Sequence, residues 1–103
     1  MNELDYLVWP TRIQGRLFRA GIPYECIILK LGYTTNILEL YNPGRHFKLA
    51  TYSYEQGVRA INVATGEITE LDSKDEEEIT NTLVRCFLRF CNHCDDMTLN
   101  MLI

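Results

Sequence analysis

The feature that most constrains the fold is a series of short strand-like segments in the middle of the chain. Each is rich in apolar and β-branched residues and is bounded by turn residues. They lie at 24–33, 37–41, 47–53, 58–63 and 67–71. The segment 47–53 alternates in side-chain type, as a strand with one buried face does. Gly66 closes the loop between the last two and supplies the positive φ that a tight hairpin requires. The pattern predicts an antiparallel meander of four to five strands.

A helix is predicted on either side of these strands. Pro10 to Ala20 reads as a short helix with proline at its first position and Gly21 just beyond its end. The second helix runs from Asp75 to about His93, and Ser73 and Glu76 have the spacing of a capping box. Its apolar face comprises Ile79, Leu83, Cys86, Phe87, Phe90 and Cys94. Strands grouped between helices predict an α+β domain spanning 1–103, with the long helix packed on one face of the sheet.

Composition excludes several classes of function. The 103 residues carry a net charge of −4, which argues against nucleic acid as the direct partner. No run approaches the ~20 apolar residues of a membrane span, and the first residues lack the basic region of a secretory signal. The four cysteines are then expected to be free thiols in a cytoplasmic protein.

Residues with reactive or metal-binding side chains form no complete site in the sequence. Cys91, His93 and Cys94, with Cys86 one turn earlier, offer zinc ligands, but a second ligand pair at zinc spacing is missing. Buried thiols are the favoured interpretation, with a zinc-stabilised domain as the minor alternative. His46 is interpreted as a surface-loop residue. No phosphate-binding loop, nucleotide motif or carboxylate pair is found. The prediction is a protein without enzymatic activity, metal or cofactor.

Residue type and expected exposure suggest a protein-binding surface. Tyrosine is enriched at interfaces because it buries area at little entropic cost. The equal alternative is that one of Tyr52 and Tyr54 faces the core and the other faces solvent. The acidic run 75–78 suits either a partner or the positive end of the helix dipole. The predicted contact residues are Tyr52, Tyr54, Glu55, Arg59, Asp72, Asp75, Glu76 and Glu77. In this prediction the tyrosines anchor the partner and the carboxylates steer it.

Three segments resemble the SUKH superfamily of bacterial toxin-immunity proteins. "RLFRAGIP" (16–23) is similar to its "FLxxxGLP" helix exit, and "GVRAINVATGEITELDS" (57–73) resembles its late hairpin. "ITNTLVRCFLRF" (79–90) is similar to its closing helix. Together the segments cover 37 of the 103 residues, in the family's order. The chain is shorter than most members, and "CNHC" is not a family feature.

The resemblance implies a cytoplasmic, non-enzymatic protein that neutralises a toxin by binding it directly. Such toxins are often nucleases or nucleic-acid deaminases, and a basic toxin or effector is the expected partner. An acidic protein is steered to such a basic surface. The alternative prediction is a small phage or mobile-element protein that inhibits a host defence or regulatory protein.

Overall fold

The computed structural model describes residues 3–32 and 36–91, with side chains from Trp9 onward. Two α-helices and five strands make up most of it. In chain order the elements are α1 (Glu3–Arg19), the 3-10 turn η1 (Tyr24–Cys26), β1 (Ile27–Leu31), β2 (Asn36–Tyr41), β3 (Lys48–Ser53), β4 (Gly57–Ile61), β5 (Ile68–Leu71) and α2 (Glu76–Cys91). This order confirms the predicted α+β fold.

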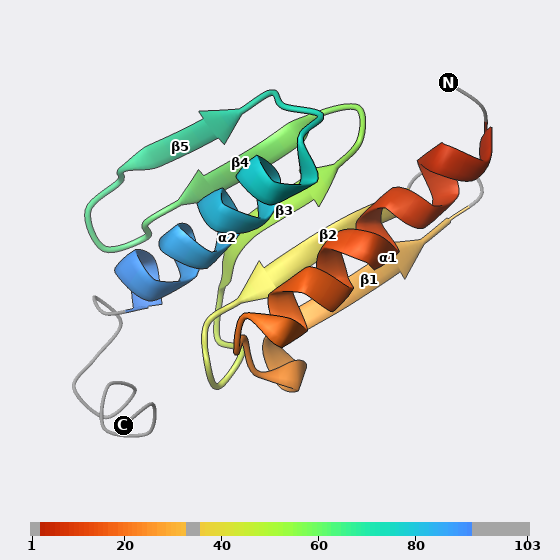
Figure 1. Cartoon of the computed structure of the whole chain (residues 1–103). Helices are drawn as coiled ribbons and strands as arrows, with labels where there is room; N and C mark the ends of the chain where they lie inside the picture. The colour runs from red at the N-terminus through yellow and green to blue at the C-terminus, as the bar shows by residue number, and fades with distance from the viewer. Residues whose placement is uncertain (1–2, 33–35, 92–103) are drawn as a thin grey trace.

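The strands form one antiparallel sheet in the order β1-β2-β3-β4-β5, so each strand pairs with its neighbour in sequence. Both helices lie side by side on the same face of this sheet (Figure 1). α1 covers β1 and β2, and α2 covers β3, β4 and β5. The described residues thus form a two-layer structure, and among them no helix covers the second face of the sheet.

The core lies between the helix layer and the sheet. α1 contributes Ile13 and Leu17, and α2 contributes an apolar stripe at helical spacing, Ile79, Leu83, Cys86, Phe87 and Phe90. Alternate sheet residues meet them: Leu38, Leu40, Tyr52 and Val58 are all fully buried. The helical period of the last segment therefore locates the face that it buries, as predicted; Cys94, also assigned to that face, lies outside the described residues.

The first helix differs from its prediction. α1 begins at Glu3, and Pro10 lies inside it rather than at its first position. A proline inside a helix removes one backbone hydrogen bond and strains the preceding turn. Pro10 is itself buried, and Ile13 and Leu17 bury the same face, so tertiary packing offsets that cost. Gly21 follows the helix with φ 100°, which confirms its predicted place just beyond the helix end.

Four of the five strands are shorter than predicted, β1 at both ends and β3, β4 and β5 at one end each. Local turns take some of these residues. Tyr24–Cys26 forms η1, in which the Cys26 amide donates to the Pro23 carbonyl at 3.1 Å. At the end of β4, Asn62 Oδ1 accepts a hydrogen bond from the Ala64 amide at 3.0 Å and so starts a turn. Pairing of β5 with β4 begins at Ile68, one residue after the predicted start at Glu67. Gly57 opens β4 and pairs with Ser53.

The sheet face away from the helices carries a buried carboxylate on β2. Glu39 lies between Leu38 and Leu40, which face the core, so its side chain projects from the opposite face. Its oxygens accept hydrogen bonds from Tyr41 Oη at 3.0 Å and Lys48 Nζ at 3.1 Å, and Lys30 Nζ lies 3.4 Å away. Burial raises the pKa of Glu39, but these hydrogen bonds and lysine charges outweigh it, and the net pKa is lowered.

Neither of the two described helices is long and apolar enough to cross a membrane.

Candidate protein-binding site

The predicted contact residues gather at one end of the molecule, where the β3–β4 turn lies beside the connection from β5 to α2. Gly57 makes this approach possible. Its φ is 72°, and a Cβ at this position would overlap the carbonyl oxygen of Leu71. Lys74 then ties the two segments together. Its Nζ donates to the Tyr54 carbonyl at 2.6 Å and lies 3.8 Å from the centroid of the Tyr54 ring.

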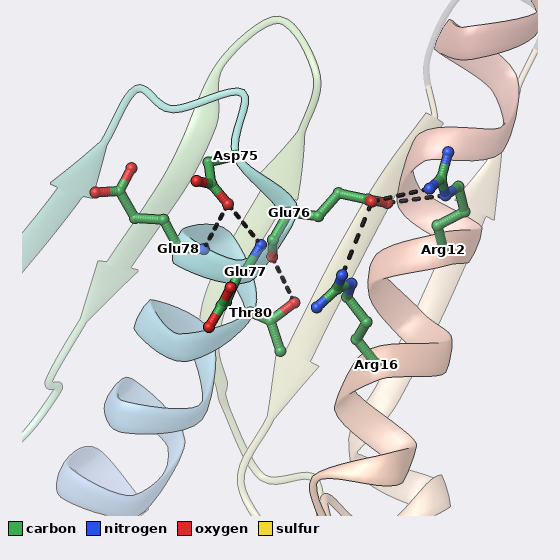
Figure 2. Close-up of polar contacts among 7 residues, drawn as sticks. All are labelled: Arg12, Arg16, Asp75, Glu76, Glu77, Glu78 and Thr80. Atoms are coloured by element: carbon green, nitrogen blue, oxygen red, sulfur yellow. Dashed lines mark hydrogen bonds and ion pairs between the residues drawn. The ribbon is translucent and has the colours of Figure 1, made fainter.

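The start of α2 places several carboxylates on this end. Asp75 is the N-cap: its Oδ1 accepts hydrogen bonds from the amides of Glu77 at 2.9 Å and Glu78 at 3.2 Å (Figure 2). The predicted capping box is therefore wrong. Ser73 Oγ instead accepts a hydrogen bond from the Asp75 amide at 3.0 Å, one residue before the Glu76 amide that a capping box requires. A charged acceptor at the positive end of the helix is favoured over a hydroxyl.

Glu76 was predicted to be an exposed steering residue, and this prediction is wrong. Its side chain is only 14% exposed and points across to α1 (Figure 2). Arg12 contacts both carboxylate oxygens: its Nε lies 2.8 Å from Oε1, and its Nη2 donates a hydrogen bond to Oε2 at 2.9 Å. Arg16 Nη2 lies 4.0 Å from Oε2. Because its charge is bound to two arginines of the same chain, Glu76 anchors α2 to α1.

The two tyrosines have different roles. Tyr52 is fully buried opposite Leu38 and Val58 on the core face, so its prediction as a contact residue is wrong. The strand alternation turned it inward, and burial raises its pKa. Tyr54, two residues later and beyond the end of β3, is half-buried. It meets Trp9 edge-to-face at 5.9 Å between ring centroids, which braces it at the surface.

Arg59 and Asp72 form an ion pair with each other. Arg59 Nη2 lies 3.0 Å from Asp72 Oδ1, and the Arg59 Nη1 donates to the Val58 carbonyl at 2.8 Å. Arg59 is half-buried on the sheet face opposite the helices, in register with Thr51 and Glu70. The Asp72 side chain remains 77% exposed, so it can meet a partner while Arg59 positions it.

The structure thus brings five carboxylates together at this end. They are Glu55, Asp72, Asp75, Glu77 and Glu78, all exposed, and we call this surface the acidic end. Glu78 was missing from the predicted contact set, although it continues the same acidic run. Three arginines of α1, Arg12, Arg16 and Arg19, were also absent from the predicted set, although their spacing of four and three residues indicates one helix face.

The cysteines do not combine into a site within the described residues. Cys26 and Cys86 are free and buried, Cys91 is also buried, and no group of three metal-binding side chains occurs among the residues described. His93 and Cys94, the other candidate zinc ligands, lie outside them. Burial raises the pKa of Cys26 to about 11 and also raises that of Cys86, so both thiols stay protonated and unreactive at neutral pH. His46 is exposed in the loop between β2 and β3.

Comparison of the chain with family models, with curated proteins and with solved structures finds no match.

Proposed function

We propose that this protein is a non-enzymatic binding module of the immunity type. In this proposal it neutralises a toxin that attacks nucleic acid, by binding the toxin directly in the cytoplasm. The acidic end covers a basic surface of the toxin, and Tyr54 supplies an aromatic contact in its centre. No cofactor takes part. The resemblance of three segments to the SUKH superfamily supports the same function.

The observation that carries this proposal is the charge balance of the acidic end. Its five exposed carboxylates have two cations near them, Lys74 and Arg59, and both are engaged within the chain. The remaining negative charge is therefore available to a partner. Carboxylates grouped on one surface accelerate association with a basic partner and orient it, more than they add to final affinity.

Rigidity of the backbone under these charges favours the same interpretation. The Lys74 contact to Tyr54, the Asp75 cap and the Arg12–Glu76 ion pair hold the turn and both helices in one arrangement. A surface that is already ordered loses little conformational entropy when a partner binds. The acidic end can thus bind a partner without first folding.

Growth rescue tests the proposal. The protein is co-expressed with a nucleic-acid-targeting toxin encoded beside it in the source genome, and unmodified protein should restore growth. The double variant Glu55→Lys/Glu77→Lys should reduce the association rate constant about tenfold or more at low salt and weaken rescue. The matched control Glu25→Lys/Glu70→Lys makes the same charge change at two exposed carboxylates outside the acidic end.

The outcomes separate the alternatives. Thermal unfolding of each variant first establishes that it is folded at the growth temperature. Rescue by the control but not by the acidic-end variant supports the proposal. Equal rescue by both variants refutes the role of the acidic end. Lack of rescue by the unmodified protein, together with capture of a host defence protein, favours the inhibitor alternative.

A further inference from the structure

A second charged surface, of opposite sign, lies along α1. Arg12, Arg16 and Arg19 recur at intervals of four and three residues and so follow one side of the helix. They border a groove of about 350 Å³ between α1 and the start of α2. We call it the arginine groove; its lining residues are Thr11, Arg12, Gly15, Arg16, Arg19 and Glu76.

The positive charge of the arginine groove is only partly neutralised. Glu76 is the one acidic residue among those that line it, and Arg12 binds both of its oxygens. Arg16 reaches the same carboxylate only at 4.0 Å (Figure 2). The groove is thus lined by three guanidinium groups and one carboxylate, within a protein whose net charge is −4. Arg12 also shows that a guanidinium of this groove can bind a carboxylate, since its Nη2 donates a hydrogen bond to Glu76 Oε2 and its Nε lies 2.8 Å from Oε1.

Gly15 leaves the floor of the groove open. Glycine inside a helix costs about 1 kcal/mol relative to alanine, and here no turn or positive φ requires it. A Cβ at Gly15 would lie 3.5 Å from Arg19 Nη1, so the Arg19 guanidinium folds back over the glycine and into the groove. A larger side chain at this position would occupy the space between Arg16 and Arg19.

We propose that the arginine groove binds an acidic segment of another protein in extended conformation. Along the helix axis, Arg12 and Arg16 are separated by about 6 Å and Arg16 and Arg19 by about 4.5 Å. In an extended chain, carboxylates on alternate residues are about 6.6 Å apart, which long arginine side chains can match. The volume is that of a site for a ligand of several groups, larger than a single oxyanion needs. The inference does not depend on the acidic end.

Binding is tested with a peptide of five Glu-Ser repeats, which presents a carboxylate at every second residue. Titration of the full chain, followed by the backbone amide of Gly15 in an ¹⁵N-labelled NMR spectrum, should show saturable binding. Affinity should fall steeply between about 20 mM and 150 mM salt, because exposed charges are screened over that range. A peptide of Lys-Ser repeats should leave the Gly15 signal unchanged.

Variants then locate the site. Arg16→Gln/Arg19→Gln should weaken binding about tenfold or more, and Arg85→Gln, at an exposed arginine on α2, should not. Gly15→Leu keeps every charge but fills the groove, so it should abolish binding while α1 stays folded. Arg12 is left unchanged because it holds α2 through Glu76.

Three results would overturn the proposal. The first is undetectable peptide binding by unmodified protein at low salt. The second is equal binding by Gly15→Leu, which would mean diffuse attraction to the whole surface. The third is saturable binding of inorganic phosphate at Gly15 with no binding of the peptide, which would identify a site for a small oxyanion instead.

Discussion

Gly57 offers the sharpest test of how the two connections at the acidic end are held together. Alanine at φ 72° costs about 1–2 kcal/mol, because its Cβ crowds the following carbonyl. Here the added Cβ would also overlap the Leu71 carbonyl oxygen and lie 3.0 Å from Asp72 Oδ1. The Leu71 oxygen belongs to the backbone of β5 and cannot rotate away. Overpacking of this kind costs about 1–3 kcal/mol. Gly57→Ala should therefore lower the free energy of unfolding by about 3 kcal/mol.

Gly66→Ala is the matched control. Gly66 has φ 79°, but nothing lies within 4 Å of an added Cβ. In Gly66→Ala only the cost of placing alanine at a positive φ applies. Alanine also lowers the conformational entropy of the unfolded chain, which offsets about 0.4–1 kcal/mol of that cost. Each kcal/mol corresponds to about 4–8 °C in a domain of this size, so Gly57→Ala should unfold roughly 10 °C below Gly66→Ala. Urea and thermal unfolding measure both. Equal midpoints would refute the close approach of the β3–β4 turn to β5.

Two further predictions concern single polar side chains. Glu39→Gln should destabilise the fold by about 1–2 kcal/mol at pH 7, since it removes charge-assisted hydrogen bonds from a buried carboxylate. Because its pKa is lowered on folding, the stabilisation by Glu39 is complete above the unfolded pKa near 4.5 and lost as pH falls through the folded value. Unfolding curves of the two proteins should thus converge at acid pH, and a constant gap would contradict this. Asp75→Ala should lower the free energy of unfolding, measured with urea, by about 1 kcal/mol, which is more than Ser73→Ala should. A larger loss in Ser73→Ala would instead identify Ser73 as the N-cap.

The elements with strong local patterns were predictable. The apolar period of 79–90 defined α2 and its buried face, because an amphipathic helix carries that information within itself. Turn residues located five strands in the right order, and Gly21 marked the end of α1. The strand ends were less predictable. At Asn62, the side chain accepts a hydrogen bond from the Ala64 amide, and this turn competes with continued pairing of β4. Composition does not show whether the turn or the strand forms.

The candidate site was predictable only in part. The acidic run 75–78 could be read as exposed, but Glu76 turns toward an arginine more than sixty residues earlier. Nothing in the run distinguishes Glu76 from Glu77. Tyr52 and Tyr54 are two residues apart and would share a face if the strand continued through both. They differ because β3 ends at Ser53, which leaves Tyr52 paired in the sheet and Tyr54 in the turn beyond it.

By itself, the sequence determined the fold class, the order of its elements and the excess of negative charge, because periodicity, turn residues and composition are local or additive properties. The tertiary structure decided which charges are free. Whether a carboxylate can meet a partner depends on the cations that the fold brings within about 4 Å of it, and those come from other helices and strands. The same packing that neutralises Glu76 leaves its neighbour Glu77 exposed.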